Sequence, residues 1–261
     1  AWPVTWVHNA FENAASTAAG IEAAIKALKR KGKIPADKKI RILAIGGDGG
    51  TYDIGFQALS GAIERWHDFT YLCYDNGAYM NTGIQRSGAT PTFGATTTSP
   101  AGSVIPGKTQ RRKPLTEIIA AHDLPYAAQA SPGHWLDLAK KAYKALTTEG
   151  PTFLNVLSPC PPGWVFPEDQ TVEIAKLAVE TGFWPLFEYE DGKWRITYKP
   201  KGLSADDPDP LEKFKPLEEF LKTQGRFKHV MRNPELIERL KDEVRRQWRR
   251  LLALEKATEN W

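Results

Sequence analysis

An aspartate surrounded by four glycines follows a short apolar run, and this combination of residues could do chemistry. The run covers residues 40–45, and the segment directly after it reads GGDGG at 46–50. Glycines let the backbone approach another group closely, and a helix that begins at such a turn presents free N–H groups that favour phosphate. Asp48 would repel a bare phosphate, so its presence indicates a bridging cation. Mg²⁺ fits because it prefers oxygen ligands and often joins a carboxylate to a diphosphate.

A second set of oxygen atoms is expected from the next strand. Residues 69–74 form another apolar run, and Asp75-Asn76-Gly77-Ala78 follows it. The 26 residues between Gly49 and Asn76 are enough for one helix and one strand. Ligands of open parallel sheets bind beyond the carboxyl ends of the strands. The Asn76 side-chain carbonyl and the Ala78 backbone carbonyl could therefore join Asp48 around one cation.

A Rossmann dinucleotide site is the main rival for this turn. It requires the pattern Gly-x-Gly-x-x-Gly, with Gly47 and Gly49 as the first two glycines. The position of the third glycine is occupied by Tyr52. The acid between the glycines also disfavours a pyrophosphate that is bound without a metal.

The elements that would position these residues alternate between strands and helices. Further strands are predicted at 126–129 and 152–157, and a hairpin at 187–198 turns at Asp191-Gly192. Apolar spacing predicts helices at 10–30, 52–65, 115–121, 132–148 and 170–182. This order predicts an α/β fold with an open, mostly parallel sheet and helices on both faces. The long segment 76–114, rich in Gly, Thr, Ser and Pro, is expected to be either functional or disordered.

The pattern changes in the C-terminal part. Residues 199–210 are rich in Pro and Asp, and two charged helices are predicted at 211–222 and 233–257. We therefore divide the chain into a domain at 1–198 and a C-terminal extended and helical arm at 199–261. Because the second helix is too polar to form a core alone, the arm is expected to pack on this domain or on a partner.

Composition narrows the class of protein. The chain has 261 residues, 41% of them hydrophobic, which is enough for a sizeable core. Its net charge of +4 is too small to argue for nucleic acid. No apolar run approaches the roughly 20 residues of a membrane span, and the N-terminus lacks a signal-peptide pattern. The two cysteines, Cys73 and Cys160, make no disulfide framework, so a cytoplasmic location is expected.

The spacing of Gly47-Asp48-Gly49 and Asn76 resembles the thiamine diphosphate signature, which begins with Gly-Asp-Gly and closes with Asn. In that family the aspartate, the asparagine and a backbone carbonyl two residues later hold Mg²⁺ against the diphosphate. By this resemblance the metal ligands are Asp48, Asn76 and Ala78. The resemblance also implies cofactor contacts for Gly47, Gly49, Gly50 and Thr51.

Three longer stretches narrow the resemblance. The loop YDNGAYMNTGIQRSGATPTFGATTTSPAG at 74–102 is similar to the β subunits of pyruvate:ferredoxin oxidoreductases, in the 2-oxoacid:ferredoxin oxidoreductase family. The stretches AFENAASTAAGIEAA at 10–24 and LSPCPPGW at 157–164 resemble the same subunits. The resemblance covers roughly residues 2–255. It implies that 1–198 is a thiamine diphosphate-binding domain, which carries the pyrophosphate and Mg²⁺ half of the site.

The resemblance implies an activity that needs other chains. It is the coenzyme A-dependent oxidative decarboxylation of pyruvate, with electrons passing through iron–sulfur clusters to ferredoxin. Asn81 would be the catalytic residue near the substrate, and Thr82 and Gly83 would line the diphosphate. Arg86 is either an anion contact or a solvated charge. An α subunit would supply the pyrimidine-binding domain, further γ- and δ-type subunits are expected, and the chain alone should be inactive.

The same subunits bind a [4Fe–4S] cluster near thiamine through four cysteines, the last of them in a Ser-Pro-Cys segment. Cys160, in Ser158-Pro159-Cys160, matches this ligand, and the other three are absent from the sequence. One cysteine cannot hold a four-iron cluster, so a preceding cysteine-rich segment is expected to supply the rest. Cys73 lies within a strand and is expected to be a buried core thiol.

Two alternatives stay open. The same scaffold could act on oxalate or 2-oxobutyrate, because part of the substrate discrimination lies on the partner subunit. A more remote alternative is a non-catalytic polyanion-binding module that uses the basic stretch RRQWRR at 245–250. Glu243, Glu255 and Glu259 interleave with these basic residues, as on a solvated or subunit-facing helix.

Overall fold

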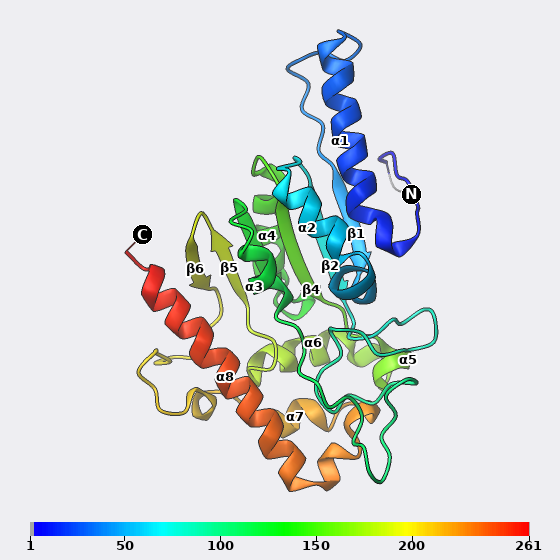
Figure 1. Ribbon diagram of the computed structural model, residues 1–261. Helices are drawn as coiled ribbons and strands as arrows, with labels where there is room; N and C mark the ends of the chain where they lie inside the picture. Colours follow the sequence, from blue (N-terminus) through cyan, green and yellow to red (C-terminus); the bar gives the residue numbers. More distant parts are fainter. Residues whose placement is uncertain (1–2, 261) are drawn as a thin grey trace.

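The computed structural model describes residues 3–260. The first two residues of the predicted domain 1–198 and the last residue of the predicted arm 199–261 therefore lie outside the described part. Its centre is a six-stranded sheet in the order β1-β2-β4-β3-β5-β6 (Figure 1). Strands β1 to β4 are parallel to one another, and β5 is antiparallel to both β3 and β6. The open, mostly parallel sheet is therefore confirmed. The strands are β1 Leu43–Gly47, β2 Thr70–Asp75, β3 Tyr126–Ala130, β4 Thr152–Leu157, β5 Phe187–Glu190 and β6 Lys193–Ile196.

The parallel register aligns the carboxyl ends of three neighbouring strands. Gly47 of β1 pairs with Tyr74 of β2, and Asp75 of β2 pairs with Leu157 of β4. The segments that follow these strands therefore leave the sheet at one edge. This is the edge where an open parallel sheet binds its ligands.

Helices cover both faces of the sheet, as predicted. On one face, α1, α2 and α3 share a core with strand residues such as Ala44, Tyr71 and Phe153. On the other face, α4 packs through Ala145 on Leu154. These helices are α1 Ala14–Arg30, α2 Phe56–Glu64, α3 Leu115–Ala120 and α4 Trp135–Thr147.

The face that carries α4 is only partly covered. Leu43 and Ile45 of β1 and Tyr74 of β2 stay 40, 46 and 44% exposed. Their neighbours Ala44 and Cys73 point to the opposite face and are buried. An exposed apolar strip therefore runs from the first residue of β1 toward the carboxyl ends of β1 and β2, and such strips are typical of contacts with another chain.

Several predicted elements differ in their bounds, and two of these differences have a clear physical reason. The strand predicted at 40–45 is observed at Leu43–Gly47, so it runs into the glycines. Gly46 belongs in the strand because a Cβ there would collide with the Tyr71 side chain. The helix predicted at 211–222 is a 3₁₀ turn, Pro210–Lys213, followed by the short helix α7, Leu217–Leu221. Pro216 separates the two because its nitrogen has no hydrogen to donate to the preceding turn.

The C-terminal segment packs on the rest of the chain (Figure 1). The helix α8, Pro234–Thr258, buries a stripe that includes Leu236, Leu240, Val244 and Trp248. This stripe shares one core with α6, Thr171–Glu180, and with α7. The arm therefore packs on this domain, and the division at 198 stays a prediction. No helix within residues 3–260 is both long enough and apolar enough to cross a membrane.

Replacing Trp248 by alanine tests whether α8 is part of the core. Trp248 is fully buried, its indole N–H donates to the Gly182 carbonyl at 2.7 Å, and its ring centroid lies 4.6 Å from that of Phe214. We expect Trp248→Ala to lower the free energy of unfolding by about 3–5 kcal/mol, because it leaves a cavity and an unpaired carbonyl.

Lys256→Ala is the control, because this residue lies on the exposed face of the same helix. It should change the free energy of unfolding by less than about 0.5 kcal/mol. Urea unfolding followed by circular dichroism measures both variants. Equally small effects would show that α8 is only loosely attached.

Candidate functional site

Asp48 begins a tight helical turn directly after β1. It precedes a π-helical segment, Gly49–Ile54, which leads into α2. A Cβ at Gly49 would enter the ring of Tyr79, and one at Gly50 would lie 2.8 Å from the Phe11 carbonyl oxygen. These two glycines therefore let the turn pack closely against two other segments of the chain.

Three oxygen-bearing groups converge at this turn. One terminal atom of the Asn76 side-chain amide lies 2.7 Å from Asp48 Oδ1 and 2.9 Å from the Ala78 carbonyl oxygen. With its nitrogen at that position, the amide donates to both acceptors. With its oxygen there, three oxygens surround one point, an arrangement that a cation stabilises. The set of one carboxylate, one amide and one backbone carbonyl thus fits Mg²⁺.

Asp48 and Asp75 are neighbouring carboxylates, each only 1% exposed. Burial and the charge of Asp75 raise the pKa of Asp48 to about 8, against hydrogen bonds that favour its charged form. One of these comes from Ser87 Oγ, which donates to Asp48 Oδ2 at 2.5 Å, and another from the Asn76 N–H at 3.2 Å. Asp48 therefore keeps a proton more readily than a surface carboxylate, and a bound cation would take the place of that proton.

Arg112 balances the second carboxylate. Its guanidinium donates to Asp75 Oδ2 and, at 2.7 Å, to the Tyr52 hydroxyl. Asn155 donates to the same hydroxyl at 2.9 Å. Burial raises the pKa of Asp75, whereas Arg112 lowers it. Asp75 is thus fixed in an ion pair, and Asp48 is the carboxylate of the two that has no cationic side chain bonded to it within residues 3–260.

The other predicted contacts fall into two groups. Thr51 is fully buried, and its hydroxyl donates to the Gly47 carbonyl at 2.7 Å, so it stabilises the turn itself. Asn81, Thr82 and Gly83 are exposed at the tip of a small hairpin whose base is the bridge between residues 79 and 85. The base of this hairpin packs on the Asp48 turn, and the tip projects into solvent.

Cys160 lies at the same edge of the sheet. It follows β4, is half-buried and precedes the short helix α5, Pro161–Trp164. Trp164 ties this segment to the metal-site residues, because its indole N–H donates to the Asn76 carbonyl at 2.6 Å. Cys73 is fully buried in β2. Residues 3–260 contain no group of three His, Cys, Asp or Glu side chains that could hold a metal ion, so by themselves they do not fit a [4Fe–4S] cluster.

Known proteins with a similar sequence place this arrangement in a family. A family model described as thiamine pyrophosphate enzyme, C-terminal TPP binding domain, matches residues 2–156. The chain is 52% identical to the pyruvate synthase subunit PorB of Thermotoga maritima over 263 residues, which are 100% of this chain and 78% of that protein. This chain belongs to the β subunits of the 2-oxoacid:ferredoxin oxidoreductases.

Two further relatives are named for different substrates. The β subunit is 58% identical to PorB of Methanocaldococcus jannaschii over 229 residues, 88% of this chain and 73% of that protein. It is 47% identical to the ketoisovalerate oxidoreductase subunit VorB of Pyrococcus abyssi over 247 residues, 95% of this chain and 75% of that protein. The predicted thiamine diphosphate-binding fold is confirmed, and the likeness extends across substrate types.

Sequence reasoning missed three partners in the β subunit's site. Ser87 and Arg112 lie in the long segment 76–114, whose composition indicated function without selecting residues. Asp75 is the last residue of β2, and an acidic residue at the end of a buried strand could have been identified from the sequence as a site residue. Arg86, whose role was left open, is exposed, and its backbone N–H donates to Thr98 Oγ1.

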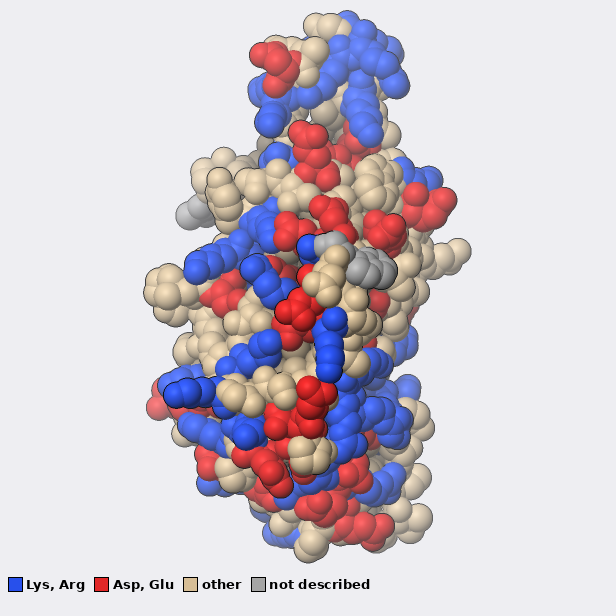
Figure 2. All heavy atoms as spheres, turned by 90° about the vertical axis from the view of Figure 1, so that its left-hand side faces the viewer, with Lys and Arg blue, Asp and Glu red and all other residues tan. Residues whose placement is uncertain are grey.

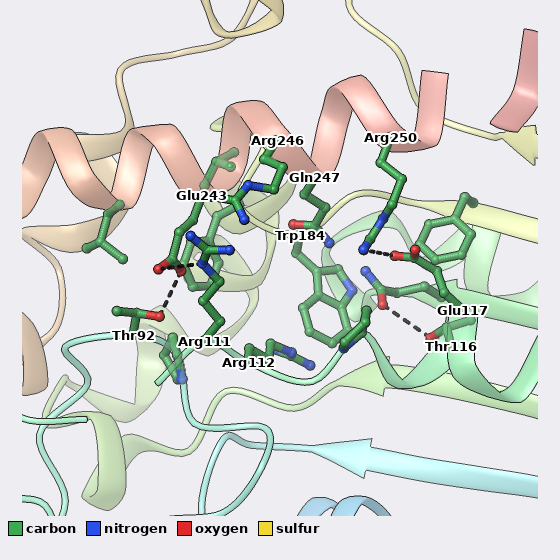
Figure 3. Close-up of a pocket in the computed structure, with 17 residues that line it drawn as sticks. Thr92, Arg111, Arg112, Thr116, Glu117, Trp184, Glu243, Arg246, Gln247 and Arg250 are labelled. Carbon is green, nitrogen blue, oxygen red and sulfur yellow. Dashed lines mark hydrogen bonds and ion pairs between the residues drawn. The ribbon is translucent and has the colours of Figure 1, made fainter. Parts of the chain in front are cut away.

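The β subunit also has a cavity of about 290 Å³ between α8, α3 and the 76–114 segment, with Arg112 in its wall (Figure 3). Across it, Thr92 donates to Glu243 at 2.7 Å and Arg250 donates to Glu117 at 2.6 Å. The described lining residues include none of the predicted cofactor contacts. The cavity is therefore separate from the Asp48 turn, although Arg112 in its wall reaches Asp75 beside that turn.

Arg112→Met tests the buried ion pair. It leaves Asp75 without its cation, and we expect the free energy of unfolding to fall by about 3 kcal/mol at pH 8. The pKa of Asp75, already raised by burial, would rise further without Arg112. A carboxyl group with a higher pKa in the folded than in the unfolded state binds more protons when folded, so stability falls as pH rises above about 4. The loss should therefore be smaller at pH 5 than at pH 8.

Urea unfolding at the two pH values measures the effect of Arg112→Met. Arg111→Met is the matched control, because the side chain of Arg111 is 56% exposed and lies 3.6 Å from Glu243. It should cost about 0.5 kcal/mol at either pH. A pH-independent loss in Arg112→Met would contradict the ion-pair role.

Proposed function

We propose that the chain holds the diphosphate of thiamine diphosphate through a Mg²⁺ ion bound by Asp48, Asn76 and the Ala78 carbonyl, as the β subunit of a pyruvate:ferredoxin oxidoreductase. The convergence of these three groups at the ends of β1 and β2 is the observation that carries the proposal. They are oxygen ligands of the kind that Mg²⁺ prefers. When bound, thiamine diphosphate supplies the electron sink for the bond that breaks next to the 2-oxo group.

The residues of this chain bind and orient. Ser87 donates to one Asp48 oxygen and the Asn76 N–H donates to the other, so the carboxylate is fixed before a metal arrives. Gly47, Gly49, Gly50 and Thr51 form the turn that would hold the diphosphate. Thr82 and Gly83, which are exposed in this chain alone, would line the bound diphosphate, and Asn81 would be the catalytic residue near the substrate.

Pyruvate is the proposed 2-oxoacid, because the relatives with the highest identities reported above are pyruvate synthase subunits. The 47% identity to a ketoisovalerate oxidoreductase subunit supports a division of labour in which the partner subunit selects the side chain of the substrate. Oxalate and 2-oxobutyrate remain alternatives on the same scaffold. Assays of the assembled complex on these four acids, with a reducible dye as electron acceptor, decide between them.

The proposed partners are an α subunit with the pyrimidine-binding domain, γ- and δ-type subunits, and ferredoxin, with coenzyme A as co-substrate. The apolar strip of Leu43, Ile45 and Tyr74 supports a subunit contact beside the strand ends. A contact there would bring a second chain to the edge of the sheet where the cofactor is proposed to bind. We propose a cytoplasmic location for the complex and no role for a membrane.

The polyanion-binding alternative is not favoured by any specific contact. Arg245 pairs with Asp209 at 2.9 Å, and Arg250 pairs with Glu117 at 2.6 Å. Figure 2 shows the side of the molecule that lies to the left in Figure 1, and over its lower half Lys and Arg are interspersed with Asp and Glu. The densest group of basic residues lies at the top, over the projecting end of α1. Paired charges on α8 are typical of a helix that is fixed to its own domain.

Asp48→Ala tests the proposed metal site. We expect it to abolish the Mg²⁺-dependent binding of thiamine diphosphate to the assembled complex, because the diphosphate loses the carboxylate end of its bridge. Asn76→Ala should weaken binding by about tenfold, because it removes one neutral ligand. Isothermal titration with thiamine diphosphate, with and without Mg²⁺, measures both effects. Glu64→Ala, an exposed acid at the end of α2, is the control. Unchanged affinity in Asp48→Ala would overturn the proposed site.

We propose further that Cys160 is one of four cysteine ligands of a [4Fe–4S] cluster, the others lying outside the sequence described here. Its place beside the Asn76 turn supports a short path for electrons from the cofactor. In the complete subunit, Cys160→Ala should lower the iron content and slow the reduction of ferredoxin, while thiamine diphosphate binding is retained. Cys73→Ala is the matched control, because this thiol is fully buried in β2. Iron analysis of both variants decides, and an unchanged iron content in Cys160→Ala would refute the assignment.

A further inference from the structure

Arg226 is a buried cation that forms no ion pair with any residue in 3–260. It lies in the 3₁₀ turn Gly225–Phe227 after α7 and is only 6% exposed. Its Nε donates to the Gln224 side chain at 2.9 Å, and its guanidinium stacks on the Trp164 ring, 3.7 Å from the ring centroid. Within residues 3–260, neither terminal nitrogen has a hydrogen-bond or ion-pair partner. A buried guanidinium normally has a carboxylate or several carbonyls around it.

The guanidinium lies against the turn that carries two of the proposed metal ligands. A Cβ at Gly77, which separates Asn76 from Ala78, would lie 3.0 Å from Arg226 Nη1. Gly77 also has a φ of +76°, so glycine is favoured there for two independent reasons. The indole on which Arg226 stacks donates to the Asn76 carbonyl at 2.6 Å. Arg226 therefore lies against the turn.

The surroundings of Arg226 do not balance its charge. Burial and the nearby Arg112 lower its pKa to about 9, and the more distant Asp75 and Asp48 compensate only in part. Asp75 is already paired with Arg112. Stacking on Trp164 and the hydrogen bond to Gln224 hold the guanidinium in place, but neither group carries a negative charge that would balance it.

A bound ligand would change the balance of charge around Arg226. The buried carboxylates Asp48 and Asp75 have a formal charge equal and opposite to that of two cations, the buried Arg226 and the partly exposed Arg112. A divalent cation at Asp48 leaves this region positive, and an anionic diphosphate restores the balance. Removing Arg226 would make the same site more favourable for a free divalent cation and less favourable for the diphosphate.

We infer that Arg226 is a positioning residue that selects the anionic diphosphate through the Asn76–Ala78 turn, and so makes the site specific for a metal–diphosphate unit over a free metal ion. The inference rests on the proposed function, because it assumes that the ligand at this turn is thiamine diphosphate with a divalent cation. It predicts that removing the charge of Arg226 lowers the affinity for the diphosphate and raises the affinity for a free metal ion. A residue that only supported the shape of the turn would change both in the same direction.

Arg226→Met in the assembled complex, freed of cofactor with a chelator, tests this inference. Mn²⁺ replaces Mg²⁺ and is titrated first without the cofactor, with the free ion followed by electron paramagnetic resonance. Thiamine diphosphate is then titrated at saturating Mn²⁺ by calorimetry. We expect the affinity for thiamine diphosphate to fall by about tenfold or more, and the affinity for Mn²⁺ to rise.

Two further variants separate charge from shape. Arg226→Lys keeps the charge and should keep both affinities within about threefold, whereas Arg226→Gln keeps a hydrogen-bond donor without the charge and should behave like Arg226→Met. If Arg226→Met does not fold, Arg226→Gln takes its place. Arg239→Met is the control for net charge, because Arg239 also stacks on an aromatic ring, that of Phe93, at 4.9 Å. It should leave both affinities unchanged.

The results distinguish this inference from the proposed function. If the unaltered complex binds no thiamine diphosphate with Mn²⁺, the proposed function fails and the inference fails with it. If the unaltered complex binds and the charge-removing variant binds equally well, only the inference fails. If both affinities fall together, Arg226 only supports the fold, and the inference is again overturned.

Discussion

The burial of two carboxylates side by side is the constraint on which the rest of this site depends. The parallel register of β1 and β2 brings Asp48 and Asp75 to one edge of the sheet, where both lose their water. Their mutual repulsion and burial raise the pKa of Asp48 to about 8. Such a pair is stable only if cations or protons are supplied. Arg112 supplies one cation to Asp75, whereas the charge of Asp48 has to be neutralised by a proton or by a bound metal.

The long segment 76–114 is ordered by polar contacts of its own, and these let it reach both carboxylates. Lys108 is almost fully buried and donates to the carbonyls of Thr90 and Arg111 at 2.5 and 3.3 Å. The Gly88 N–H donates to Asp53, in the turn after Asp48, at 2.7 Å. The segment thereby brings Ser87 to Asp48 and Arg112 to Asp75. A segment that could have been disordered is instead part of the site.

The sequence predicted the parts of the site that depend on local order along the chain. The convergence of Asp48, Asn76 and Ala78 follows from two parallel strands with one helix between them, because the carboxyl ends of such strands meet at one edge. The ion pair of Asp75 with Arg112 could not be predicted, because Arg112 lies 37 positions after Asp75 along irregular chain. The sequence pattern also could not predict where the Thr51 side chain points, since its hydroxyl donates to the carbonyl of Gly47 inside the turn.

The C-terminal arm is part of the same physical unit as the site, although it supplies none of the proposed metal ligands. Its helices share a core with Phe93 of the 76–114 segment and with Trp164. Gly225 sits so close to Val165 that a Cβ would lie 2.6 Å from its side chain, and the Ala95 N–H donates to the Arg226 carbonyl at 3.1 Å. The arm therefore fixes the segment that carries Ser87 and Arg112, and the Trp164 ring that bonds the Asn76 carbonyl. A boundary drawn from composition at residue 198 separates polar helices from a sheet, but the electrostatic balance around Asp48 depends on side chains from both parts.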